Sequence, residues 1–206
     1  MAHQLRLGGL DAVAHGEGDL TLLLMHGAGA GQRHPFMAGV AAAVAVHGIR
    51  VVTFDFPYIT DGRRLPDRAP RLLAALDQAV DALHVPASSL FIGGKSLGGR
   101  MATMWLVAGG RAAGLVVLGY PLNPPRGLPQ PERAQILASV PGRGLIVQGS
   151  RDGFGHPDLI AATAPAAILV HPLPGADHAF AVPQRTAADV LAEVSSLTAA
   201  FLLTKP

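Results

Sequence analysis

The sequence predicts a three-layer αβα sandwich, in which helices cover both faces of a mostly parallel sheet of about six or seven strands. Strand-like and helical stretches alternate along the chain, which is typical of parallel sheets. The strand-like runs are almost wholly apolar, as expected for strands that are covered on both faces. Hydrophobic residues make up 50% of the 206 residues and charged residues 15%, so most helices should be largely buried.

The expected strands are short apolar runs that end in glycine or polar residues, at 20–25, 49–54, 90–93, 115–119, 145–149 and 167–171. The expected helices have apolar residues at helical spacing, at 36–47, 70–83, from the Ser96 turn to about 108, 132–139, 157–163 and 186–203. The proline-rich stretch 121–131 should be irregular. A chain of 206 residues suits one domain over residues 1–206, and the loops at the carboxyl ends of its strands should share one ligand-binding edge.

The stretch Gly94-Lys95-Ser96-Leu97-Gly98 fits the G-x-S-x-G pattern, and it lies between a predicted strand and a predicted helix. A serine on so sharp a turn sits in strained backbone, and side chains in place of the flanking glycines would collide with neighbouring backbone. A phosphate-binding P-loop would also need a glycine where the chain has Ser89. The pattern therefore favours an exposed nucleophilic serine.

A serine hydroxyl needs a base, and the base needs a carboxylate that holds its tautomer. Asp152 and His178 each follow a predicted strand and come after Ser96 in the order Ser, Asp, His. His156 is the main competitor for the base. Asp177 is adjacent to His178, but consecutive loop side chains usually diverge, so we expect it to fix the loop or to be solvated. We predict Ser96, Asp152 and His178 as the catalytic residues.

The oxyanion of an acyl-transfer reaction needs backbone donors, which we expect to be the N–H groups of Leu97 and Ala28. Ala28 lies in a glycine-rich loop after the first predicted strand, where His26 should pin the loop. The same loop could begin a dinucleotide-binding fingerprint, but its third glycine is replaced by Gln32. For Asp55 we expect an Asx-type bond to the turn that follows it.

Four further side chains lie near the same edge. Lys95 could be a base, but its position in the turn favours a structural contact directed away from the substrate. The aromatic residues Tyr58, Phe154 and Phe180 could line a pocket, and packing under the loops is an equal alternative.

The composition limits the partners. The net charge is only +2, and no segment concentrates Lys and Arg, so we expect no nucleic-acid partner. The chain has no cysteine, and its His, Asp and Glu residues lack metal-ligand spacing, so we expect neither a metal nor a cofactor. The apolar runs are too short to span a membrane, and the expectation is a soluble cytoplasmic protein without a membrane partner. The oligomeric state stays open.

Several stretches together resemble the α/β-hydrolase superfamily, and in particular one small branch without a cap domain. The stretches that carry this resemblance are 26–31, 34–37, 54–58, 93–100, 119–122 with Pro124 and Pro125, and 147–152. The branch includes a hydrolase-like domain in a subunit of the nonspecific-lethal chromatin complex, a testis-expressed protein, and small bacterial proteins called dienelactone-hydrolase-like. The resemblance implies the α/β-hydrolase fold and a serine-hydrolase site on Ser96, Asp152 and His178.

These observations predict a serine hydrolase that cleaves a carboxylic ester through an acyl-enzyme. Only about 25 residues separate the fourth and fifth predicted strands, which leaves no room for a cap domain. An open site suits a small or short-chain ester. The alternative is a non-catalytic hydrolase-like protein that serves in binding or as a scaffold, because the chromatin member of the branch acts in an assembly and a fold does not certify catalysis. Acyl transfer or peptide hydrolysis by the same residues is a third reading.

Overall fold

A computed structural model describes residues 2–124 and 130–204 of the chain. Its eight strands are β1 (Ala2–Leu7), β2 (Leu10–His15), β3 (Leu20–Met25), β4 (Ile49–Phe54), β5 (Leu90–Lys95), β6 (Gly114–Leu118), β7 (Gly144–Gly149) and β8 (Ile168–Leu173). Its helices are α1 (Pro35–Ala45), α2 (Pro57–Thr60), α3 (Ala69–Leu83), α4 (Leu97–Val107), α5 (Pro131–Ala138), α6 (Pro157–Thr163) and α7 (Ala187–Leu203).

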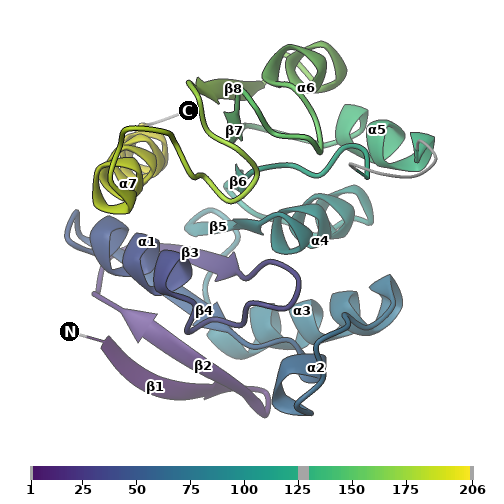
Figure 1. Cartoon of the computed structure of the whole chain (residues 1–206). Helices are drawn as coiled ribbons and strands as arrows, with labels where there is room; N and C mark the ends of the chain where they lie inside the picture. Colours follow the sequence, from purple (N-terminus) through teal and green to yellow (C-terminus); the bar gives the residue numbers. More distant parts are fainter. Residues whose placement is uncertain (1, 125–129, 205–206) are drawn as a thin grey trace.

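All eight strands form one sheet in the order β1-β2-β4-β3-β5-β6-β7-β8 (Figure 1). The six strands from β4 to β8 in this order pair in parallel, whereas β2 runs antiparallel to both β1 and β4. The mostly parallel sheet that the sequence predicted is thus confirmed, with a strand count slightly above the predicted six or seven.

The two additional strands are β1 and β2, which form a hairpin at the edge of the sheet. Their turn is Gly8–Gly9, and both glycines have positive φ, as a tight two-residue hairpin turn requires. Four of the six β1 residues are exposed, and only two of the six β2 residues, Ala12 and Ala14, are buried. Neither strand therefore has the continuous apolar run that marked the other six.

Helices cover both faces of the sheet (Figure 1). Side chains of α1 and α7 pack with one face of the strands, and side chains of α3, α4, α5 and α6 pack with the other. The central strands are buried on both sides, β6 completely so. This is the three-layer architecture expected from the sequence.

Most helix ends follow simple local rules. Proline occupies the first turn of α1, α3, α5 and α6, where its missing N–H is not needed. Thr186 and Asp189 form a reciprocal capping box at the start of α7. The six predicted helices are present with ends shifted by two residues or fewer, and the single-turn helix α2 was not predicted.

The predicted irregular stretch 121–131 falls partly on residues 125–129, outside the described part of the chain. Within the described part, α5 is the one helix between β6 and β7. None of the described helices combines the length and the apolar character that crossing a membrane requires.

The parallel strands end at a common edge, and this places the site. Ser96 directly follows β5, Asp152 lies three residues after β7, and His178 lies in the loop after β8. Because β5 and β7 flank β6 and β8 lies next to β7, the three loops converge at the carboxyl edge of the sheet.

Candidate active site

Ser96 sits on a strained turn between β5 and α4. Its backbone has φ 50° and ψ −108°, a conformation that non-glycine residues rarely adopt. A Cβ on Gly94 would lie 2.5 Å from the carbonyl oxygen of Met25, and one on Gly98 would overlap the same carbonyl. The Ser96 N–H donates to the Leu118 carbonyl at 3.1 Å, which ties the turn to β6. Both glycines of the G-x-S-x-G pattern are therefore sterically required here.

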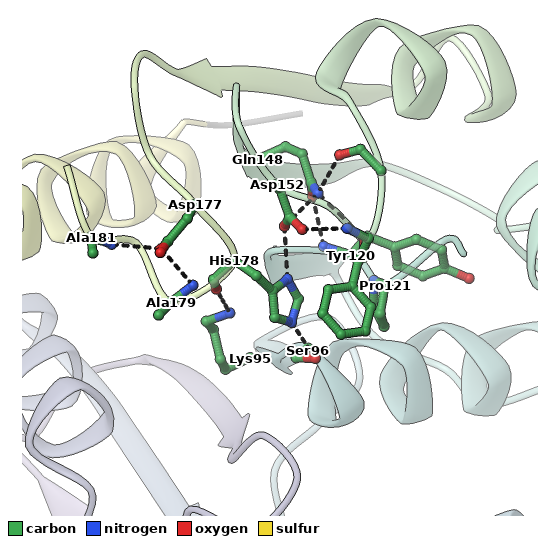
Figure 2. A network of polar contacts seen from close by, with 12 residues as sticks. Lys95, Ser96, Tyr120, Pro121, Gln148, Asp152, Asp177, His178, Ala179 and Ala181 are labelled. Atoms are coloured by element: carbon green, nitrogen blue, oxygen red, sulfur yellow. Dashed lines mark hydrogen bonds and ion pairs between the residues drawn. The ribbon is translucent and has the colours of Figure 1, made fainter. Parts of the chain in front are cut away.

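The three predicted catalytic side chains form a hydrogen-bonded line (Figure 2). His178 Nε2 lies 2.8 Å from Ser96 Oγ, and His178 Nδ1 lies 2.7 Å from Asp152 Oδ2. The Asp152 side chain is fully buried, whereas that of His178 is 23% exposed. With Nδ1 donating to the carboxylate, Nε2 is free to accept the serine proton, which is the arrangement that activates a serine.

Asp152 is held by more than His178. Its Oδ1 accepts a hydrogen bond from the Phe154 N–H at 2.8 Å, and its Oδ2 accepts one from Gln148 Nε2 at 2.9 Å. The buried Gln148 also donates to the Gly155 carbonyl at 2.9 Å, and its Oε1 accepts from the Tyr120 N–H at 2.7 Å. Gln148 thus fixes the carboxylate to two backbone segments (Figure 2).

Gln148 is a site residue that was not predicted from the sequence. The available signal was one polar residue within β7, whose other five residues are apolar or glycine and which is buried throughout. A buried amide in such a strand needs hydrogen-bond partners, and here they belong to the candidate site.

The loop that carries His178 is fixed by Asp177, as predicted. One oxygen of Asp177 accepts from the N–H groups of Ala179 and Ala181, each at 2.9 Å (Figure 2). Phe180 within this tight turn has φ 66°, which is unusual for an aromatic residue. The turn presents His178 toward Ser96 while Asp177 points away from the hydrogen-bonded line.

Lys95 connects the turn at Ser96 to the same loop. Its Nζ donates to the His178 carbonyl at 2.5 Å and lies 4.8 Å from the centre of the Phe180 ring. Burial lowers the pKa of Lys95 to about 8, although the charges of Asp152 and Asp177 oppose this shift. The predicted structural contact is present, and Lys95 is also one of the residues that line the cleft at Ser96.

The loop after β3 is pinned by His26. This buried ring donates from Nδ1 to the Gly27 carbonyl at 2.8 Å and accepts at Nε2 from the Phe56 N–H at 3.1 Å, in the tautomer that these partners require. Burial lowers the pKa of His26, which favours this neutral form. A Cβ on Gly27 would lie 3.8 Å from the Ser96 Cβ, so the loop runs close beside the serine.

Asp55 holds the same loop, which corrects the Asx turn expected for it. Its carboxylate accepts from the Gln32 N–H at 2.6 Å and from Gln32 Nε2 at 3.1 Å. Gln32 is the residue in place of the third glycine of a dinucleotide fingerprint, and its buried side chain links β4 to the loop instead. Ala28 of this loop and Ser96 line one cleft, and Leu97 begins α4. The backbone N–H groups of Ala28 and Leu97 remain the predicted oxyanion donors.

An open cleft of about 670 Å³ lies over Ser96. We call it the Ser96 cleft; its walls include the β3–α1 loop, the first turn of α1, Phe154 and the His178 loop. The Phe154 ring packs on the His178 ring with their centres 4.1 Å apart and their planes inclined by 32°. Of the three aromatic residues predicted to line a pocket, Phe154 lines this one.

The other two aromatic residues do not line the Ser96 cleft. Tyr58 is fully buried, and its hydroxyl accepts a hydrogen bond from the Gly29 N–H at 3.1 Å, beneath the β3–α1 loop. Phe180 is also buried and packs edge-on against Phe36. Tyr58 thus packs under the loop, whereas Phe180 packs against Phe36 and lines a different hollow from the Ser96 cleft. His156, the competing base, caps α6 by accepting from the Asp158 N–H and takes no part in the hydrogen-bonded line.

Fold and site together define an α/β hydrolase without a cap domain. A family described as alpha/beta hydrolase domain matches residues 18–203, and the chain belongs to this family. No group of three or more His, Asp or Glu side chains within residues 2–124 and 130–204 is arranged to hold a metal ion.

Solved structures share the fold at low sequence identity. A putative dienelactone hydrolase from Klebsiella pneumoniae matches with a TM-score of 0.76 and 18% identity over 100% of this chain and 99% of that one. A lidless α/β serine hydrolase from Xanthomonas campestris matches with a TM-score of 0.74 and 18% identity over 100% and 97%. Est1E from Butyrivibrio proteoclasticus with ferulic acid bound matches with a TM-score of 0.71 and 15% identity over 98% of each chain.

Proposed function

We propose that this protein is a serine hydrolase that cleaves carboxylic esters of small or short-chain substrates through an acyl-enzyme. The observation that carries the proposal is the unbroken line from Ser96 through His178 to Asp152, with contacts of 2.8 and 2.7 Å, in which Ser96 and His178 line an open cleft. A buried carboxylate, a histidine and a serine on a strained turn are together the elements that acyl transfer needs.

In the proposed reaction, Ser96 Oγ attacks the ester carbon while its proton passes to His178 Nε2. The carbonyl oxygen becomes an oxyanion that the N–H groups of Ala28 and Leu97 stabilise. The C–O bond to the alcohol then breaks, and His178 gives its proton to the departing oxygen. Water repeats the sequence on the acyl-enzyme with His178 as base, which releases the acid and restores Ser96. Asp152 stays ionised and orients His178 throughout.

The cleft supports the proposed class of substrate. Its walls are mostly apolar or glycine, and it is open to solvent, so one face of a bound substrate stays in water. Such a cleft favours compact esters over long or bulky ones. The structural similarity to the putative dienelactone hydrolase and to Est1E supports ester chemistry in general.

Turnover of p-nitrophenyl acetate and butyrate tests this proposal. Replacing Ser96 by Ala should reduce kcat by at least about 10³-fold, and Asp152→Asn should have an effect of similar order because it permits the wrong histidine tautomer. Ser196→Ala is the matched control, since Ser196 is exposed on α7 and remote from the Ser96 turn in sequence and fold. A wild-type protein that hydrolyses neither ester would instead favour the non-catalytic binding or scaffold alternative.

A further inference from the structure

A second hollow of about 490 Å³ lies between the first turns of α1 and α7, and we call it the α1–α7 pocket. The two helices lie side by side on one face of the sheet (Figure 1). The walls of the pocket are mainly apolar, and its larger apolar side chains are Pro35, Phe36, Phe180, Val182, Val190 and Leu191. None of its lining residues belongs to the hydrogen-bonded line at Ser96.

The α1–α7 pocket and the Ser96 cleft share the lining residues His34, Phe36 and Ala179. The two hollows are therefore neighbours, separated by a thin wall. Phe36 supplies the large apolar side chain of that wall. Its ring stands edge-on against the Phe180 ring, with 5.5 Å between the centres and 71° between the planes.

The two rings of this wall are held differently. Phe180 is buried, and its left-handed backbone is fixed by its N–H bond to the Asp177 carbonyl at 3.0 Å within the His178 loop. Phe36 lies in the first turn of α1, is partly exposed, and touches neither Ser96 nor His178 by any hydrogen bond of the described structure. Phe36 can therefore be replaced without removing any hydrogen bond of the line at Ser96.

We propose that Phe36 sets the chain length that the Ser96 cleft accepts, and that the α1–α7 pocket is a latent subsite for the far end of an unbranched aliphatic chain. This inference rests on the proposed ester hydrolase function. The lining of the pocket is mainly apolar, which suits hydrocarbon, and its polar members are His34, Arg185 and Thr186. With Phe36 in place, methylenes beyond the Ser96 cleft stay in water and add no binding energy.

Replacing Phe36 by a smaller residue should let a longer aliphatic chain of the substrate contribute to binding. Each methylene that moves from water into the pocket should raise kcat/KM about fourfold, the factor that corresponds to about 0.8 kcal/mol. For Phe36→Ala we therefore expect kcat/KM for p-nitrophenyl decanoate, relative to butyrate, to exceed the wild-type ratio at least about tenfold. A second series, alkyl acetates of rising alcohol length followed by acid release, tells whether the acyl or the alcohol chain enters.

Two variants serve as controls. Phe201→Ala removes a ring from the other end of α7, where it packs against Phe91, and should leave the chain-length profile unchanged. Adding Ala188→Phe to Phe36→Ala should refill the pocket and cancel the gain, because Ala188 lines it from α7. If Phe36→Ala does not fold, Phe36→Leu opens the wall less and should give a smaller gain of the same sign.

A binding measurement separates this inference from the proposed function. In the Ser96→Ala background, decanoate should bind the Phe36→Ala protein at least about tenfold more tightly than the protein with Phe36, as read by calorimetry. An unchanged chain-length profile in both ester series, or a gain that Ala188→Phe does not remove, would overturn the role of Phe36. Absence of turnover by the wild type would instead reject the hydrolase, while the decanoate measurement would still report on the pocket.

Discussion

Gln148→Leu tests whether the candidate site depends on the buried amide beneath it. Leucine has a similar volume, so packing should change little. The substitution leaves the Tyr120 N–H and the Gly155 carbonyl without their Gln148 partner, and each buried unpaired group costs about 1–3 kcal/mol. We therefore expect the free energy of unfolding to fall by roughly 3 kcal/mol.

The same change removes a hydrogen bond to the Asp152 carboxylate. A bond to a charged group contributes about 1.5–3 kcal/mol, and its loss lets Asp152 rotate away from His178 Nδ1. We expect kcat on p-nitrophenyl butyrate to fall about 10- to 100-fold with little change in KM, because Gln148 does not line the Ser96 cleft.

Urea denaturation and steady-state kinetics, corrected by titration of reactive serine, measure the two effects separately. Gln135→Leu is the matched control, since Gln135 is exposed on α5, and it should alter neither quantity. A Gln148→Leu protein that is less stable but keeps the wild-type kcat per reactive serine would refute the positioning of Asp152 by Gln148.

Three other outcomes follow from the same geometry. Lys95→Met should lower kcat about tenfold, because the His178 carbonyl loses a charged donor. Steady-state kinetics, with the Ser96→Ala protein as the baseline, measures this change. An unchanged kcat would show that the contact is unimportant. The pKa of Lys95 is about 8 in the folded protein and near 10.5 in the unfolded chain, so between these pH values the unfolded state binds more protons. In this window the unfolding free energy of the wild type should therefore rise with pH relative to that of Lys95→Met. A difference between the two proteins that stays constant with pH in urea titrations would contradict the lowered pKa. In Gly119→Ala, a residue with positive φ gains a Cβ that would lie 3.1 Å from Lys95 Nζ and 3.6 Å from the His178 ring. The substitution should therefore reduce both the melting temperature and kcat. A variant with the wild-type values of both would contradict the close packing behind Ser96, His178 and Asp152.

The sequence allowed the candidate catalytic residues to be located because two independent constraints converge on them. Ser96 is flanked by glycines at two positions where any side chain would strike the Met25 carbonyl, and that requirement is visible in a five-residue pattern. Asp152 and His178 are constrained by chain order and by their position after parallel strands, which the alternation of strands and helices already reveals.

Other features depend on contacts that no local pattern encodes. The amide of Gln148 could be seen as polar within a buried strand, but its partner Asp152 is set by how the loop after β7 turns back. Whether Phe180 points into the Ser96 cleft or beneath it depends on its left-handed backbone angle. An aromatic residue in the sequence does not indicate such an angle. The β1–β2 hairpin was missed because its strands lie at an edge and carry few buried residues, although its Gly8–Gly9 turn was a usable signal.

The central claim is that Ser96 acts as a nucleophile activated by His178 and Asp152, and covalent labelling tests it most directly. The wild-type protein treated with a fluorophosphonate should gain one adduct by intact mass, and peptide mapping should locate it on Ser96. The Ser96→Ala protein should gain none, and His178→Ala should react far more slowly. Labelling of Ser96→Ala at the wild-type rate, or a folded wild-type protein that does not react, would contradict the account.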